Sequence, residues 1–195
     1  MLTRRTSLLL PLLFAGCGGG SKQRSYPPLR YDYLTPLGLN VASIQIEQRF
    51  VPSGVAPDVS QSDPEPPLRA LRAMAEDRLQ ALGSAGQAVF VIQDASLVRR
   101  GDTLSGSLAA ELGIYTAPNA RAGYARASVS GRFTGDLDDL PARLYDMTKT
   151  MMDRMNVEFE YQVRHSLGAW LVSAGAARAP VEQQPLTATP LPRSP

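Results

Sequence analysis

Alternating apolar and polar positions predict four strands in the middle of the chain. Residues 39–50 alternate, with Ile44, Ile46 and Phe50 on one face and Gln45, Glu47 and Arg49 on the other, which is typical of a strand with one buried face. Residues 88–97 are apolar enough for a central strand. Residues 104–115 and 123–133 alternate again on either side of a turn at Pro118-Asn119, so we expect these two strands to pair as a hairpin.

Apolar residues at three-to-four spacing predict two helices. The first covers 63–83, with Asp63 as its N-cap and Gly83 ending it. The second runs from about 137 to 172, a length of about 50 Å at 1.5 Å per residue. Its apolar positions are Leu140, Leu144, Met147, Met151, Met155, Phe159, Val163 and Trp170. Because a small four-stranded sheet is shorter than this, one end of the helix should overhang or bend.

Three carboxylates stand where the second helix should begin: Asp136, Asp138 and Asp139. Carboxylates at this end cap free N–H groups and complement the helix dipole. The alternative is a calcium site, but the segment lacks the spaced oxygen ligands and the turn glycine that such a site requires. We therefore predict helix caps and no metal site.

The order strand, helix, three strands, long helix predicts an α+β fold. Four mostly antiparallel strands should form one sheet with both helices on one face. We expect this single domain to occupy residues 39–172. A flexible tether over 17–38 would precede it, and a disordered Pro-rich tail over 173–195 would follow it.

The expected tether contains three tyrosines, Tyr26, Tyr31 and Tyr33. They either pack the start of the chain onto the domain or contact a partner or an interface. Packing onto the domain is the simpler interpretation, because scattered apolar residues need no partner to explain them.

A short apolar run near the N-terminus ends in the chain's only cysteine. Arg4 and Arg5 precede the run, and the sequence Leu13-Phe14-Ala15-Gly16-Cys17 closes it. The run is too short to cross about 30 Å of hydrocarbon, which needs about 20 residues. A positive start, a short apolar stretch and small residues before the cut predict a signal peptide over 1–16.

The closing segment resembles the lipobox of bacterial lipoproteins. In that family the cysteine receives a diacylglycerol, the chain is cut before it, and the new amino terminus is usually acylated. The resemblance implies that Cys17 is the lipidated first residue of the mature chain. Several acyl chains, palmitate among them, anchor a protein durably where one holds it marginally. Gly18 stands where family members kept in the inner membrane carry aspartate, which implies the outer membrane, facing the periplasm. Arg4 and Arg5 leave the general and twin-arginine export routes both open.

The charge balance of the chain bears on whether it binds nucleic acid. Lys and Arg number 20 and Asp and Glu number 18, so loss of Arg4 and Arg5 with the signal would equalise the two counts. A neutral chain without a basic cluster has no electrostatic footprint for nucleic acid. We expect no nucleic-acid partner.

The sequence contains few features that would support an enzymatic activity. Nucleophile-elbow, zinc-protease, phosphate-loop and dinucleotide motifs are all missing. His165 is the only histidine, and its place beside Arg164 predicts a solvated position. Glu158 and Glu160 are two residues apart and point to different faces of a helix. We expect no catalytic residues, no cofactor and no enzymatic activity.

Four apolar residues of the second helix are candidates for a partner or ligand surface: Met147, Met151, Met155 and Phe159. Methionine adapts to irregular apolar partners, so the group could receive an acyl chain or a helix. The alternative is that the stripe is simply core. A closed apolar pocket would indicate a lipid binder, and an exposed patch or sheet edge an assembly subunit.

The element order, carried on a lipidated cysteine, resembles the small envelope accessory lipoproteins of the lipopolysaccharide-assembly and ABC-transport auxiliary types. The resemblance is topological, covers 39–172 and rests on no shared motif. It implies a non-enzymatic accessory or assembly subunit, held in the membrane by Cys17, with an envelope protein or lipid as partner. The alternative is a lipoprotein that binds a lipid or small ligand by itself.

Overall fold

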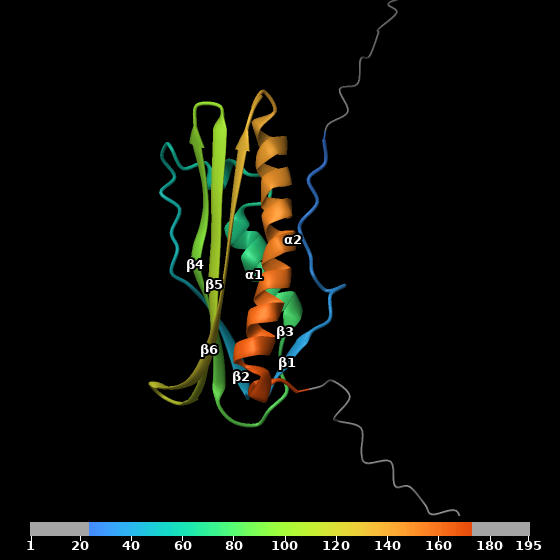
Figure 1. The fold of residues 1–195 in the computed structure, drawn as a ribbon, viewed down its shortest axis with the longest axis vertical. Coiled ribbons are helices and arrows are strands. Elements are labelled where there is room, and N and C mark those ends of the chain that lie inside the picture. Colours follow the sequence, from blue (N-terminus) through green and yellow to red (C-terminus); the bar gives the residue numbers. More distant parts are fainter. Residues whose placement is uncertain (1–23, 173–195) are drawn as a thin grey trace, which may run out of the picture.

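The computed structural model describes residues 24–172, which form an α+β fold with one four-stranded mixed sheet (Figure 1). Its strands are β2 (Ser43–Gln48), β4 (Gln87–Arg100), β5 (Thr103–Ala117) and β6 (Ala120–Thr134). They lie in the order β2-β4-β5-β6. β2 runs parallel to β4, whereas β4, β5 and β6 are antiparallel. The predicted fold class and the mostly antiparallel sheet are confirmed.

The β5–β6 hairpin is the longest pairing in the sheet and confirms the one expected from the sequence. Its register runs from Thr103 opposite Thr134 to Ala117 opposite Ala120. Asn119 in the connecting turn has φ 63°, a left-handed conformation that asparagine tolerates better than most residues. Alternate residues of β6 face the core, namely Ala125, Ala127 and Val129. Small side chains at these positions let a helix pack close to the strand.

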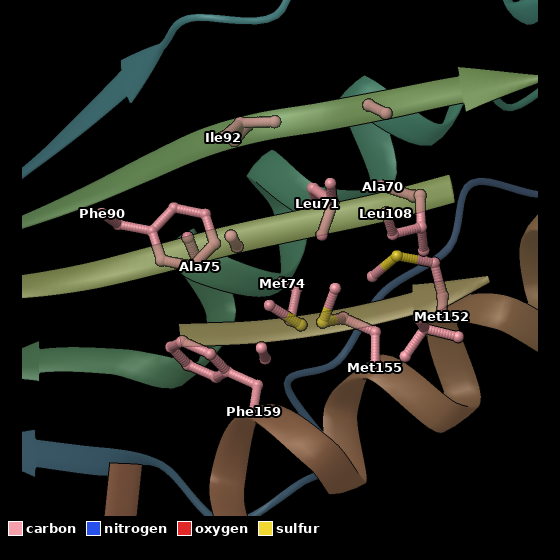
Figure 2. Packing of buried hydrophobic residues seen from close by; sticks show 14 of the residues in the cluster. Ala70, Leu71, Met74, Ala75, Phe90, Ile92, Leu108, Met152, Met155 and Phe159 are labelled. Carbon is pink, nitrogen blue, oxygen red and sulfur yellow. The ribbon is translucent and has the colours of Figure 1, made fainter. Parts of the chain in front are cut away.

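Both helices cover the same face of the sheet, as predicted. α1 (Pro67–Arg78) packs mainly on β4, and α2 (Leu140–Ser166) packs mainly on β6 (Figure 1). Figure 2 shows side chains of both helices meeting those of the sheet in one apolar core. The rings of Phe90 and Phe159 meet edge to face, with centroids 5.5 Å apart.

α1 is shorter at both ends than the predicted helix over 63–83. A residue before proline avoids the helical region, so Pro66, with φ −55° and ψ 138°, holds the start of α1 at Pro67. At the other end, Leu79–Ala81 leaves the helix as β3 and pairs in parallel with β1 (Leu37–Leu39). The prediction was wrong here because helical spacing continues through residues whose backbone bonds to a strand distant in sequence.

The predicted N-cap role of Asp63 is also wrong. Asp63 is buried, and its carboxylate accepts hydrogen bonds from the Glu65 N–H at 2.9 Å and the Thr148 hydroxyl at 2.6 Å. This carboxylate therefore joins the loop before α1 to the middle of α2, which no spacing rule could indicate.

The folded part begins earlier than residue 39, so the predicted tether over 17–38 extends too far. β1 is fully inside the domain, and Tyr31 is only 2% exposed. Arg30 pairs with Asp77 of α1, which also accepts a hydrogen bond from the Tyr31 N–H. The packing interpretation of the tyrosines therefore holds for Tyr31.

α2 has 27 residues, about 40 Å, where about 35 were expected. Asp139 is the N-cap and accepts a hydrogen bond from the Ala142 N–H, so its predicted role is confirmed. The helix ends at Ser166, and a short 3-10 turn over Gly168–Trp170 follows. This turn lets the Trp170 carbonyl accept a hydrogen bond from the Asn40 N–H, which closes the end of the core.

Candidate functional site

The β5–β6 hairpin tip curls toward the face of the sheet that the helices leave uncovered (Figure 1). Its pairing shifts register on both sides of Tyr115, which bends the strands. Gly86 in the loop before β4 has φ 78°, and a Cβ there would lie 2.9 Å from the Tyr115 carbonyl oxygen. The loop can therefore approach the hairpin this closely only with glycine.

Between the curled tip and strands β2 and β4 lies a groove of about 510 Å³, here called the tip groove. Side chains with hydrogen-bonding groups line most of it: Gln45, Glu47, Arg49, Gln87, Tyr115 and Asn119. Arg49 pairs with Glu47 at 3.5 Å, and Val89 supplies an apolar wall. Amides, a phenol and a charged pair can satisfy the polar groups of a peptide or a small polar ligand.

A charged cluster on the same face of the sheet holds the hairpin in its curled form. Glu111 of β5 is 8% exposed and accepts hydrogen bonds from Arg121 and Arg126 of β6, each at 2.9 Å. Gln93 of β4 donates to the same carboxylate. The Arg121 guanidinium also lies 4.5 Å from the centre of the Tyr124 ring. One buried carboxylate thus connects three strands next to the tip groove.

Replacing Glu111 with glutamine is expected to loosen the hairpin tip. The amide keeps one acceptor but loses the charge that two arginines share, and such charge-assisted bonds contribute about 1.5–3 kcal/mol each. We expect the unfolding free energy to fall by about 1–2 kcal/mol. Hydrogen exchange of residues 115–121 should quicken, whereas the exposed Glu76→Gln should leave it unchanged. Unaltered exchange in Glu111→Gln would contradict this role of the cluster.

The four apolar candidates on the long helix lie in the core. Met147 is 9% exposed, Met151 1%, and Met155 and Phe159 0%. Figure 2 shows Met155 and Phe159 between α2 and the sheet. A partner cannot touch these two residues in this structure, so their proposed place on a surface is wrong. Met147 and Met151 also reach a groove beside α2, and a ligand-binding role for these two stays a prediction.

The start of the described chain is fixed to the beginning of α2. Arg24 pairs with Asp139 at 3.3 Å, and the Tyr145 hydroxyl donates to the Pro27 carbonyl oxygen at 2.9 Å. The rings of Tyr26 and Tyr145 lie 5.3 Å apart. From there the chain descends along α2 to β1 (Figure 1). The polypeptide therefore enters the domain at the end opposite the tip groove.

Cys17, the predicted signal peptide over 1–16 and the predicted tail over 173–195 lie outside the described residues. Lipidation of Cys17 stays a prediction. His165 is exposed, as expected, and its ring stacks on that of Tyr161. Within residues 24–172, no helix has the length and apolar character needed to cross a membrane.

Two acidic side chains that sequence reasoning did not connect lie buried beside each other. Asp63 is 3% exposed and Glu65 2%. Burial raises the pKa of Asp63 to about 6, although hydrogen bonds from Thr148 and the Glu65 N–H act in the opposite direction. Because both carboxyl groups are shielded from solvent, substrate cannot reach them in this structure.

Asp63 is expected to make stability depend on pH. Its pKa in the folded state, about 6, lies above the ordinary value of 3.8, so folding favours the protonated form. The stabilisation is complete below about pH 3.8 and is lost as the pH rises through 6, a change of about 3 kcal/mol. Asp63→Asn should therefore raise the unfolding free energy at pH 7 and change it little at pH 4.

Denaturant unfolding of both proteins at several pH values measures this difference. Asp32 is exposed, so Asp32→Asn is the matched control and should follow the parent at every pH. An equal effect of Asp63→Asn at pH 4 and pH 7 would contradict the raised pKa.

No protein-family model and no curated protein sequence matches the chain. Among solved structures, it is similar to a candidate lipoprotein of Caulobacter crescentus CB15, with 17% identity, a TM-score of 0.33, and coverage of 62% of this chain and 85% of that one. It is also similar to a minor lipoprotein of Acinetobacter baumannii, with 9% identity, a TM-score of 0.35, and coverage of 69% and 98%. TM-scores this low establish no shared role.

Proposed function

We propose that this chain is a lipoprotein of the cell envelope, anchored through acyl chains on Cys17, that acts as an accessory or assembly subunit. It lies on the outer membrane and faces the periplasm. It turns over no substrate and binds an envelope protein at the tip groove. The lipobox-like segment before Cys17 supports the anchor.

The observation that carries the proposal is the separation between the point of chain entry and the tip groove. Arg24 and Tyr26 contact the beginning of α2. The groove is lined by residues of the β5–β6 turn, and this turn lies toward the other end of α2 (Figure 1). α2 alone extends about 40 Å between these ends. An anchor at Cys17 would therefore hold one end at the bilayer and present the groove to partners in the periplasm.

The groove is suited to a protein partner. It is open, mixes amides with a charged pair, and is bordered by the backbone of β2, which has a strand neighbour on one side only within residues 24–172. A partner segment can hydrogen-bond to such an edge while its side chains enter the groove.

Site-specific photo-crosslinking in cells tests this function. A crosslinking residue at Asn119 or Gln87, in the acylated protein, should give one defined adduct with an envelope protein. The same residue at Val157, which is exposed on α2 away from the groove, is the control and should not give that adduct. Adducts of equal yield at all three positions would contradict a specific partner at the groove. No adduct at the groove, with lipid co-purifying instead, would favour the stand-alone lipid- or ligand-binding lipoprotein.

A further inference from the structure

A second groove, of about 300 Å³, runs between the end of β6 and the first half of α2, and is here called the helix groove. Its floor is apolar and consists of Gly131 and Phe133 from β6 and Met147 and Met151 from α2. A Cβ at Gly131 would lie 3.1 Å from the Met151 sulfur and 3.3 Å from Met147 Cε. The floor therefore depends on glycine for its depth.

The rim of the helix groove is positively charged. Arg132, Arg143 and Arg154 line it, against the single carboxylate of Asp146. Within residues 24–172, none of the three guanidinium groups takes part in an ion pair. Two are held in place by other contacts: the Arg154 guanidinium donates to the Ser130 carbonyl oxygen at 2.9 Å, and that of Arg143 lies 5.1 Å from the centre of the Phe133 ring.

Methionine side chains rearrange at low cost, since they are unbranched and flexible. Met147 and Met151 already pack against the backbone of Gly131, so they accommodate a slender alkyl chain by changing rotamer along the floor. An alkyl chain gains roughly 0.8 kcal/mol for each methylene it buries. An anionic head group at the rim would meet guanidinium groups free to bind it in a charge-assisted geometry.

We propose that the helix groove binds an anionic single-chain amphiphile, with its alkyl chain on the Met147–Met151 floor and its phosphate or carboxylate head on Arg143 or Arg154, which lie at opposite ends of that floor. Binding itself does not require the proposed anchor. The location does rest on it: only six residues of chain lie between Cys17 and Arg24, so these two residues are at most about 25 Å apart. Arg24 contacts the beginning of α2, so an anchored domain would hold this groove close to the bilayer.

Calorimetric titration of the full chain carrying Cys17→Ser tests the proposal in solution. Monododecyl phosphate below its micelle concentration should bind with one site per chain. Inorganic phosphate should bind at least tenfold more weakly, because it lacks the alkyl chain. Dodecylphosphocholine should also bind at least tenfold more weakly, because its head group carries no net charge. Equal affinity for all three would overturn the proposal.

Two pairs of variants locate the site. Arg143→Gln/Arg154→Gln should weaken binding of monododecyl phosphate at least tenfold, whereas Arg99→Gln/Arg100→Gln, exposed at the end of β4, should change it less than twofold. Thr150→Trp, from an exposed position on the groove wall, should block the alkyl chain and abolish binding, whereas Val157→Trp should not. Circular dichroism of each variant is the check that it is folded.

Unchanged affinity in Thr150→Trp, or equal losses in the two arginine pairs, would place the amphiphile elsewhere and contradict the proposal. Because the chain used has no acylation site, this failure would leave the anchor at Cys17 and the tip groove intact as proposals. Conversely, failure of the anchor would leave this binding site standing.

Discussion

Replacing Cys17 with serine is expected to move the protein from the membrane fraction to the soluble fraction. A serine hydroxyl does not take the place of the thiol that receives the diacylglycerol in lipoproteins. Each methylene buried in the bilayer contributes roughly 0.8 kcal/mol, so two or three acyl chains change the partition by many orders of magnitude. This is the largest effect we expect from any single substitution.

Fractionation of cells and intact mass measurement check the result. The parent should appear in the membrane pellet, with a mass that fits a chain beginning at Cys17 plus its acyl groups. Ser21→Ala, a few residues beyond the cysteine, is the matched control and should behave like the parent. If Cys17→Ser retained the mass and the partition of the parent, the envelope placement and the accessory role would both be lost.

Replacing Arg78 with alanine is expected to cause the largest loss of stability. Arg78 is 1% exposed at the end of α1 and donates hydrogen bonds to Glu160 of α2, to the Thr35 carbonyl oxygen and to Asn156. It therefore ties α1, α2 and the segment before β1 together. Removing one partner of a fully buried ion pair costs about 3–5 kcal/mol. Glu160 is one-third exposed and keeps Arg164 as a partner, so we expect a loss near the lower end of that range, still a large part of the roughly 5–15 kcal/mol that holds a domain folded.

Thermal and denaturant unfolding measure the loss, with Arg72→Ala on the same helix as control. Arg72 is half-buried, and its substitution should cost less than about 1 kcal/mol. Arg78→Met keeps most of the side-chain volume, so it separates the effect of the lost hydrogen bonds from the effect of the cavity. Its unfolding free energy should lie between those of the parent and Arg78→Ala. Equal stability of Arg78→Ala and Arg72→Ala would show that this junction contributes little.

Substitution of Arg78 should also change how the unfolding free energy depends on pH under acidic conditions. The hydrogen bond from Arg78 lowers the pKa of Glu160, with a further contribution from Arg164. The stabilisation is present above the ordinary pKa of the carboxyl group and is lost as the pH falls through the lowered one. In Arg78→Ala this loss on acidification should be smaller than in the parent, which the same unfolding series measures.

The strand pattern and the hairpin were predictable because their signals are local. Alternation in β6 reports directly which residues face the core, and Ala125, Ala127 and Val129 are buried as that pattern requires. The cap at Asp139 was predictable for the same reason, since the residues it caps follow it directly. Such elements need no knowledge of distant partners.

The errors occur where distant segments compete with local preference. Leu79–Ala81 continues the helical spacing of α1, but its backbone bonds to β1, 42 residues earlier in the chain. Asp63 has the sequence context of a cap, yet its partner Thr148 lies in α2. The start of the domain was placed too late because Tyr31 and β1 are covered by elements far along the sequence.

Less of the candidate sites could be predicted. The methionine spacing indicated which face of α2 is apolar, but it could not separate Met155, sealed in the core, from Met147 and Met151, which border a groove. The tip groove depends on the curl of a hairpin and on residues of β2, β4 and β5 that are far apart in the chain. Only the three-dimensional register brings these residues together.

β6 is the last strand of the sheet, so within residues 24–172 its outer backbone groups have no strand to pair with. A protein confined to a membrane surface meets its own copies far more often than one free in solution, and an unprotected border fifteen residues long would invite fibre-like stacking. Arginines recur along this strand at 121, 126 and 132, and Arg154 caps one carbonyl from the side. Arg121 and Arg126 share the single charge of Glu111, so this edge keeps a net positive charge. In a chain anchored as proposed, that charge would oppose edge-to-edge pairing between neighbouring copies.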